Sequence, residues 1–138
     1  MRKEKEIKIE EGRDAGKVFV ITEMPALQMD KWATRALCAI GRSQESGIMA
    51  LLALGVTELI NSFMKADYEM IEPLMQEMLQ CCSFKKDNTR VVLKDDFVND
   101  IIEDWNTITM LRIEAIKLNL GFFTEGDGSG SELKQTTP

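Results

Sequence analysis

Hydrophobic and polar residues alternate over the first 23 positions. Ile7 and Ile9 stand among lysines and glutamates, and a second apolar run, 18–21, follows a Gly-Arg-Asp-Ala-Gly segment at 12–16. A period of two is typical of β-strands, and the two glycines give the connecting segment a permissive backbone. The pattern predicts a β-hairpin over 1–23. Its heavily charged first strand is expected to be an edge strand or a loose arm.

The hydrophobic period changes from 2 to 3.6 at Met24-Pro25. We expect a helix from there to Ile40, because proline is favoured in a first helical turn and Gly41 is a plausible stop signal. Trp32 stands at the edge of its apolar stripe. The stripe consists of Ala26, Met29, Ala33, Ala36, Leu37 and Ile40.

The next segment, 47–63, is apolar on almost every side and is interrupted by Gly55. Such a segment is normally buried, so we expect one bent helix or two short helices in the middle of the core. A further helix follows Asp67, a candidate cap, and runs to the cysteine pair at 81–82. Pro73 implies that this helix begins near residue 72 or is kinked there.

A second, short hairpin is predicted over 83–93, because two strand-like runs flank the turn-forming residues Asp87-Asn88-Thr89. The longest helix is expected to follow it, capped by Asp95 or Asp96 and running to about Leu120 before Gly121. The fold class is therefore mainly α (α+β), with four to five helices, an N-terminal β-hairpin and a short second hairpin before a long C-terminal helix. At 138 residues the chain suits a single domain over 1–123, with a flexible tail at 124–138.

Composition argues against an enzyme and against a nucleic-acid-binding protein, but it names no function of its own. The net charge is −6, which argues against a nucleic-acid partner. The chain contains no histidine, which removes the commonest general base and the commonest ligand of zinc. Four carboxylates, Asp96, Asp100, Glu103 and Asp104, share one side of the predicted helix, and we interpret them as a solvated face. We expect no catalytic residue, no metal and no cofactor.

The cysteines and the apolar segments indicate an intracellular location. Cys38, Cys81 and Cys82 are an odd number, and we expect three reduced thiols that are at least partly buried. The charged start lacks the pattern of a signal peptide. The longest weakly polar run, 47–56, is too short to cross a bilayer, so no membrane association is expected.

The long C-terminal helix carries apolar residues on two faces in its second half. One seam contains Ile101, Trp105, Ile108, Leu111, Ala115, Leu118 and Phe122; the other set is Ile113, Ile116 and Leu120, with Phe123 just beyond the helix. The second set is either buried internally or meets another chain. Methionines are usually core residues, but their flexible thioethers also suit partner surfaces, and Met75 and Met78 are candidates of this kind.

Several segments, in order, resemble tail assembly chaperones of long-tailed, lambdoid-type bacteriophages. The first two are Val18-Phe-Val-Ile-Thr-Glu-Met-Pro-Ala and Asp30-Lys-Trp-Ala-Thr-Arg-Ala-Leu. The others are the apolar run 49–56, the segment Ile71-Glu-Pro-Leu-Met-Gln-Glu-Met, and Leu111-Arg-Ile-Glu-Ala-Ile-Lys-Leu-Asn-Leu-Gly-Phe-Phe. Together they cover most of residues 18–123.

The resemblance implies a non-enzymatic chaperone that binds the helical tape measure protein and keeps it soluble until tail tube subunits polymerise around it. It implies a location in the host cell cytoplasm and absence from the mature virion. A longer, frameshifted form would recruit the tail tube protein. Copies coating one helix would associate head to tail, through the 113, 116, 120 and 123 face and the exposed edge of the first hairpin. The alternative is a small acidic phage-encoded adaptor or regulator that binds a host protein.

Overall fold

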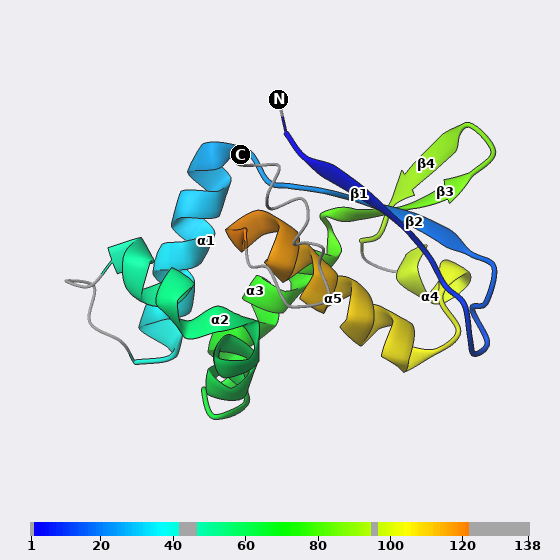
Figure 1. Cartoon of the computed structure of the whole chain (residues 1–138). Coiled ribbons are helices and arrows are strands. Elements are labelled where there is room, and N and C mark those ends of the chain that lie inside the picture. Colours follow the sequence, from blue (N-terminus) through cyan, green and yellow to red (C-terminus); the bar gives the residue numbers. More distant parts are fainter. Residues whose placement is uncertain (1, 42–46, 95–96, 122–138) are drawn as a thin grey trace.

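The computed structural model describes residues 2–41, 47–94 and 97–121, with the backbone alone for 47–54. The predicted fold class is confirmed: helices and one antiparallel sheet form an α+β fold (Figure 1). The elements of the described residues are β1 (Glu4–Lys8), β2 (Val18–Thr22), α1 (Ala26–Ala39), α2 (Gly47–Met64), α3 (Tyr68–Leu79), β3 (Cys82–Lys86), β4 (Thr89–Val92), α4 (Phe97–Ile101) and α5 (Trp105–Leu120). The predicted tail, the capping residues 95–96 and the phenylalanines at 122–123 lie outside the described residues.

The two predicted hairpins form a single sheet of order β1-β2-β3-β4, in which β1 and β4 are the edge strands. The β3–β4 turn contains Asp87, whose φ of 57° is in the left-handed region that aspartate tolerates. Phe19, Ile21 and Cys82 are fully buried in the hydrophobic core. An ion pair between Glu4 and Arg90, 3.0 Å long, joins the two edge strands.

Helix α5 is the central helix of the fold, because it packs against β2, α3 and α2. Figure 1 shows it beside the sheet, with α3 crossing it and α1 and α2 at its C-terminal side. Its Leu111, Ala115 and Ile116 are fully buried. These neighbours therefore cover α5 on more than one face.

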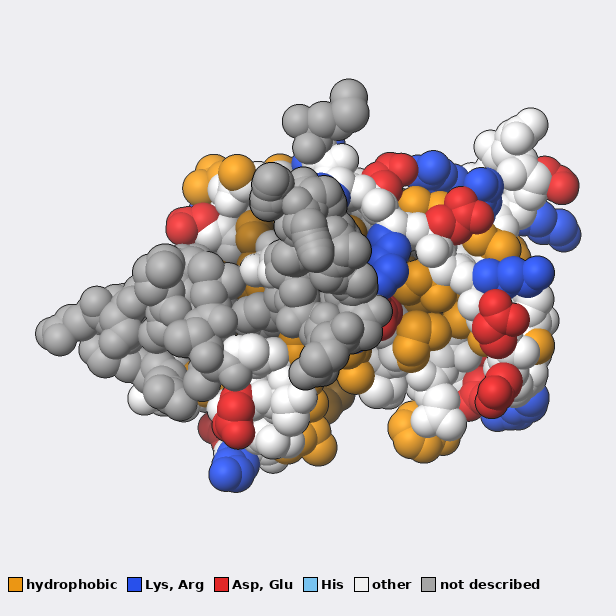
Figure 2. All heavy atoms as spheres, viewed as in Figure 1, with side chains coloured by type: hydrophobic (Ala, Val, Ile, Leu, Met, Phe, Trp, Pro, Cys, Tyr) orange, Lys and Arg blue, Asp and Glu red, His pale blue; other side chains and the backbone are white. Residues whose placement is uncertain are grey.

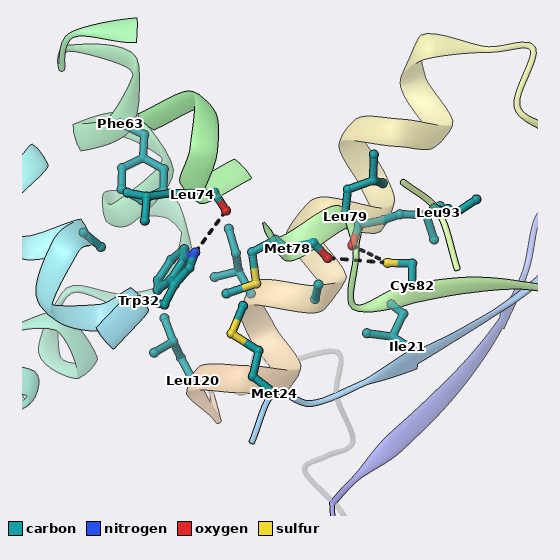
Figure 3. Packing of buried hydrophobic residues seen from close by; sticks show 14 of the residues in the cluster. Ile21, Met24, Trp32, Phe63, Leu74, Met78, Leu79, Cys82, Leu93 and Leu120 are labelled. Carbon is teal, nitrogen blue, oxygen red and sulfur yellow. Dashed lines mark hydrogen bonds between the residues drawn. The ribbon is translucent and has the colours of Figure 1, made fainter. Parts of the chain in front are cut away.

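Trp32 lies at the centre of the contact between α1, α2 and α3, and not at the edge of an apolar stripe as predicted (Figure 3). The side chain is fully buried, and its Nε1–H donates a hydrogen bond of 3.0 Å to the carbonyl oxygen of Leu74. Its ring meets that of Phe63 edge-on at a centroid distance of 6.1 Å. Burial is possible because α3 supplies an acceptor for the indole N–H.

The predicted bend in the second helix is confirmed at Gly55, whose φ of 80° suits glycine. The two alternatives for the third helix are also resolved. It begins at Tyr68 and includes Pro73. Asp67 occupies the N-cap position, but its side chain makes no capping hydrogen bond.

The prediction of one long C-terminal helix is wrong, because the chain leaves the helix between α4 and α5. The backbone N–H groups of Glu103 and Asp104 donate to the carboxylate of Asp14, at 2.9 and 3.0 Å. Asp104 then caps α5 by accepting from the N–H of Asn106 at 3.1 Å. The predicted stop is confirmed: Gly121 has a φ of 71° and its N–H donates to a carbonyl of the last turn.

Candidate functional site: a groove between α2 and α5

Helices α2 and α5 border a groove of about 310 Å³. Its lining residues are Val56, Thr57, Ile60, Asn61, Ile113 and Lys117. Residues 56 and 60 on α2, and 113 and 117 on α5, are each four apart and therefore lie on one face of their helix. The aliphatic side chains are half-buried, whereas Thr57 and Asn61 are exposed. An apolar floor between two helices, with polar residues at its margin, suits the apolar face of a third helix.

The bend at Gly55 and the packing of α2 leave this groove accessible. After the bend, Leu59 and Phe63 point into the core, with exposed fractions of 0% and 2%. Val56 and Ile60 lie on the neighbouring side of the helix, beside Leu59 and Phe63, and remain half-buried. One face of the second half of α2 therefore packs into the core, and the neighbouring face lines the groove.

Charged residues border the groove on the α5 side. Lys117 Nζ lies 3.4 Å from Glu114, which also pairs with Lys5 of β1 at 2.8 Å. Arg112, the residue before Ile113, is half-buried, and its Nε is a buried atom without a hydrogen-bond partner among the described residues. Burial lowers the pKa of Arg112, opposed by the nearby Tyr68 and Glu72. The cation at the groove, Lys117, is therefore balanced by the Glu114 carboxylate, and Arg112 lies near Tyr68 and Glu72 of α3.

The structure separates the six candidate residues that the sequence suggested. Ile113 lines the groove, but Ile116 and Leu120 have exposed fractions of only 0% and 7% and belong to the core. The prediction that they form an outer face is wrong, because the neighbours of α5 cover it. Met78 is also fully buried, and Met75 is half-buried against the core. Phe123 lies outside the described residues.

Val56 and Ile60 are not identifiable as site residues from the apolar pattern alone, because the whole segment 47–63 is predicted to lie in the core. A signal was present in its second half, where Thr57, Glu58 and Asn61 interrupt the hydrophobic run. Polar residues at these spacings mark an exposed side.

Two of the three cysteine thiols, Cys81 and Cys82, are held in the protonated form by burial. Burial raises the pKa of Cys81 to about 11, despite a hydrogen bond from Asn119, and burial also raises the pKa of Cys82. Raised pKa values disfavour the reactive thiolate. Cys38 is exposed, which corrects the expectation that all three thiols are at least partly buried.

The carboxylates of the predicted C-terminal helix do not share one helical side. The break between α4 and α5 places Asp100 in one helix and Asp104 at the cap of the next. Within the described ranges, no group of Cys, Asp and Glu side chains is arranged to hold a metal ion. The described helices are also too short or too polar to cross a membrane.

No family model, curated protein or solved structure matched this chain. The α2–α5 groove is the structural feature from which a function is argued below.

Proposed function

We propose that this protein is a non-enzymatic phage tail assembly chaperone, which binds the helical tape measure protein and keeps it soluble until tail tube subunits polymerise around it. The groove of Val56, Ile60 and Ile113 is the observation that carries this proposal, because it fits one apolar face of a helix. The segments that resemble such chaperones, in order, support it independently. The chaperone acts in the host cell cytoplasm and is absent from the mature virion.

The small size of the groove suits a transient contact. Burying apolar surface contributes about 25 cal/mol per Å², and ordering costs offset much of that gain for a few hundred Å². Many weakly bound copies along one long client nevertheless hold it effectively through multivalency. Tail tube subunits can then displace the copies one at a time.

Other partners follow from the same proposal. A longer, frameshifted form recruits the tail tube protein, and neighbouring copies on the client touch head to tail. Because Ile116 and Leu120 are buried in the core, the contacts between copies use other surfaces.

Co-expression with a tape measure protein, a long coiled-coil client, tests the function. Wild-type chaperone is expected to raise the soluble fraction of that client. Thr57→Arg places a bulky charge on an exposed margin position of the groove, and Ile113→Asp places a charge in its floor, so both variants are expected to lose the gain. Leu27→Asp is the matched control, since Leu27 is 65% exposed on α1 and does not line the groove.

Circular dichroism and thermal unfolding establish that each variant is folded. No solubility gain with wild-type protein would overturn the proposal. Capture of a compact host protein in place of the coiled-coil client would favour the adaptor alternative. Equal activity of Thr57→Arg and wild type would remove the groove from the binding surface.

A further inference from the structure

A second groove, of about 520 Å³, lies between the edge strand β1 and the N-terminal half of α5. Its lining residues are Ile7, Lys8, Ile9, Glu10, Glu11 and Gly12 from the first hairpin, and Asp104, Asn106, Thr107 and Met110 from α5 and its cap. On the face drawn in Figure 2, hydrophobic side chains are visible between α5 and β1, and acidic side chains lie beside them toward the hairpin loop.

Strand β1 presents unpaired backbone groups at this edge of the sheet. The carbonyl of Lys3 accepts from the N–H of Glu23 at 3.0 Å, and the N–H of Ile9 donates to the carbonyl of Lys17 at 2.9 Å. Because hydrogen bonding alternates along an antiparallel strand, the backbone N–H and C=O groups of the odd-numbered residues of β1 point toward β2. The N–H and C=O groups of Glu6 and Lys8 therefore point to the open edge.

The side chains around the groove define the chemistry of a ligand. Ile7 and Met110 are half-buried and contribute apolar surface. Glu10, Glu11 and Asp104 are acidic, and they outnumber the single lining lysine, Lys8. A ligand that places apolar side chains on the floor and cations beside these carboxylates is complementary to the groove.

Hydrogen bonds hold the two walls of the groove together. The buried carboxylate of Asp14, in the hairpin loop, accepts from the N–H of Asp104 and from the hydroxyl of Thr107. One turn beyond Met110, Glu114 pairs with Lys5 of β1. The hairpin is thus attached to α5 at two points, so the groove exists before a ligand binds.

We propose that this groove binds an extended peptide segment in which lysine or arginine residues alternate with apolar residues, and that the segment adds to β1 as a fifth strand. The unpaired edge supplies backbone hydrogen bonds, and the floor and the carboxylates select the side chains. This ligand differs in conformation from the helix proposed for the α2–α5 groove. The groove replaces the hairpin edge that was expected to join neighbouring copies, because its acidic lining makes it a poorer site for a second copy with a net charge of −6.

Titration of ¹⁵N-labelled full-length protein with a capped peptide of alternating valine and lysine tests the proposal by NMR. We expect saturable shifts of the Glu6 and Lys8 amides and slower hydrogen exchange at both. A valine–glutamate peptide is expected not to bind. A valine–lysine peptide with N-methyl groups on the edge that pairs with β1 is expected to have an affinity lower by a factor of at least about five.

Two protein variants separate backbone pairing from charge. Lys8→Pro removes an outward N–H, which an edge strand tolerates, and Lys8→Val removes the same charge but keeps the N–H. We expect Lys8→Pro to bind about fivefold more weakly than Lys8→Val. The double variant Glu10→Gln, Glu11→Gln is expected to bind the peptide more weakly. Its affinity is also expected to depend less on salt concentration.

Four results would overturn the proposal: no binding, shifts at other residues, equal binding of the N-methylated peptide, or equal binding by Lys8→Pro and Lys8→Val. Shifts of Glu6 and Lys8 that depend on protein concentration without peptide would identify a second copy as the occupant.

Discussion

Replacement of Asp14 is expected to destabilise the fold strongly, although the residue lies in a hairpin loop. Its side chain is fully buried and accepts four hydrogen bonds. The donors are Lys17 Nζ at 2.8 Å, the Glu103 N–H at 2.9 Å, the Asp104 N–H at 3.0 Å and Thr107 Oγ1 at 2.8 Å. Asp14→Ala removes this acceptor from all four donors. Lys17 retains the carbonyl of Ile101, whereas the other three lose the one acceptor that the structure gives them.

The expected loss follows from the number of hydrogen bonds and their environment. A hydrogen bond to a charged group contributes about 1.5–3 kcal/mol, and partly buried donors recover some of that from water. Asp14→Ala is therefore expected to lower the free energy of unfolding by about 3 kcal/mol, and Asp14→Asn, which keeps one acceptor, by about 2 kcal/mol. Asp30→Ala is the matched control on the exposed side of α1, expected to change stability by less than about 0.5 kcal/mol.

The pH dependence gives a second readout of the same residue. Burial by itself raises the pKa of Asp14, but the hydrogen bonds from Lys17, Glu103, Thr107 and Asp104 outweigh it and hold the pKa well below its usual value of 3.8. A carboxyl with a depressed folded-state pKa contributes stability that is fully present above the unfolded-state pKa. That contribution is lost as the pH falls below about 4 toward the folded-state pKa.

Urea denaturation of wild type, Asp14→Ala and Asp14→Asn, from about pH 7 down to about pH 2, measures both effects. The wild type is expected to lose its advantage over Asp14→Asn progressively below about pH 4. Equal stability at neutral pH, or a difference that does not change on acidification, would refute this role of Asp14.

Three further predictions concern the core and the thiols. Trp32→Phe removes the hydrogen bond to the Leu74 carbonyl and is expected to lower the unfolding free energy by about 1–2 kcal/mol; an unchanged urea midpoint would contradict this. Arg112→Met keeps the side-chain volume and removes a desolvated charge, so the same assay is expected to show equal or higher stability, and a loss above about 1 kcal/mol would argue for an ion pair. In mass spectrometry of the folded protein treated with a thiol reagent, Cys38 is expected to react first; rapid labelling of Cys81 would contradict its raised pKa.

Local signals were sufficient to predict much of the fold. The hairpins, the start of α1 directly after Pro25 and the bend at Gly55 each depend on residues close together in the sequence. The break between α4 and α5 does not, because the carboxylate that accepts from Glu103 and Asp104 is about ninety positions away. The helical pattern at 97–120 is uninterrupted, so it gives no indication that Asp14 breaks the helix there.

The candidate site was only partly predictable for a similar reason. The helical period identifies Ile113, Ile116 and Leu120 as apolar positions, but it does not say which of them a neighbouring element covers. The packing of α5 against β2, α3 and α2 buries Ile116 and Leu120 and leaves Ile113 at the groove. Its partner across the groove, Ile60, becomes identifiable only when α2 is placed beside α5.

Site-specific photo-crosslinking during co-expression with the tape measure protein tests whether the α2–α5 groove contacts this client. A photoreactive phenylalanine analogue is placed at Thr57, on the margin of the α2–α5 groove, and in a matched variant at the exposed Leu27 of α1. Crosslinks to the helical client are expected from position 57, and few or none from position 27. Crosslinks from position 27 alone, or none from position 57 while the client is kept soluble, would contradict it.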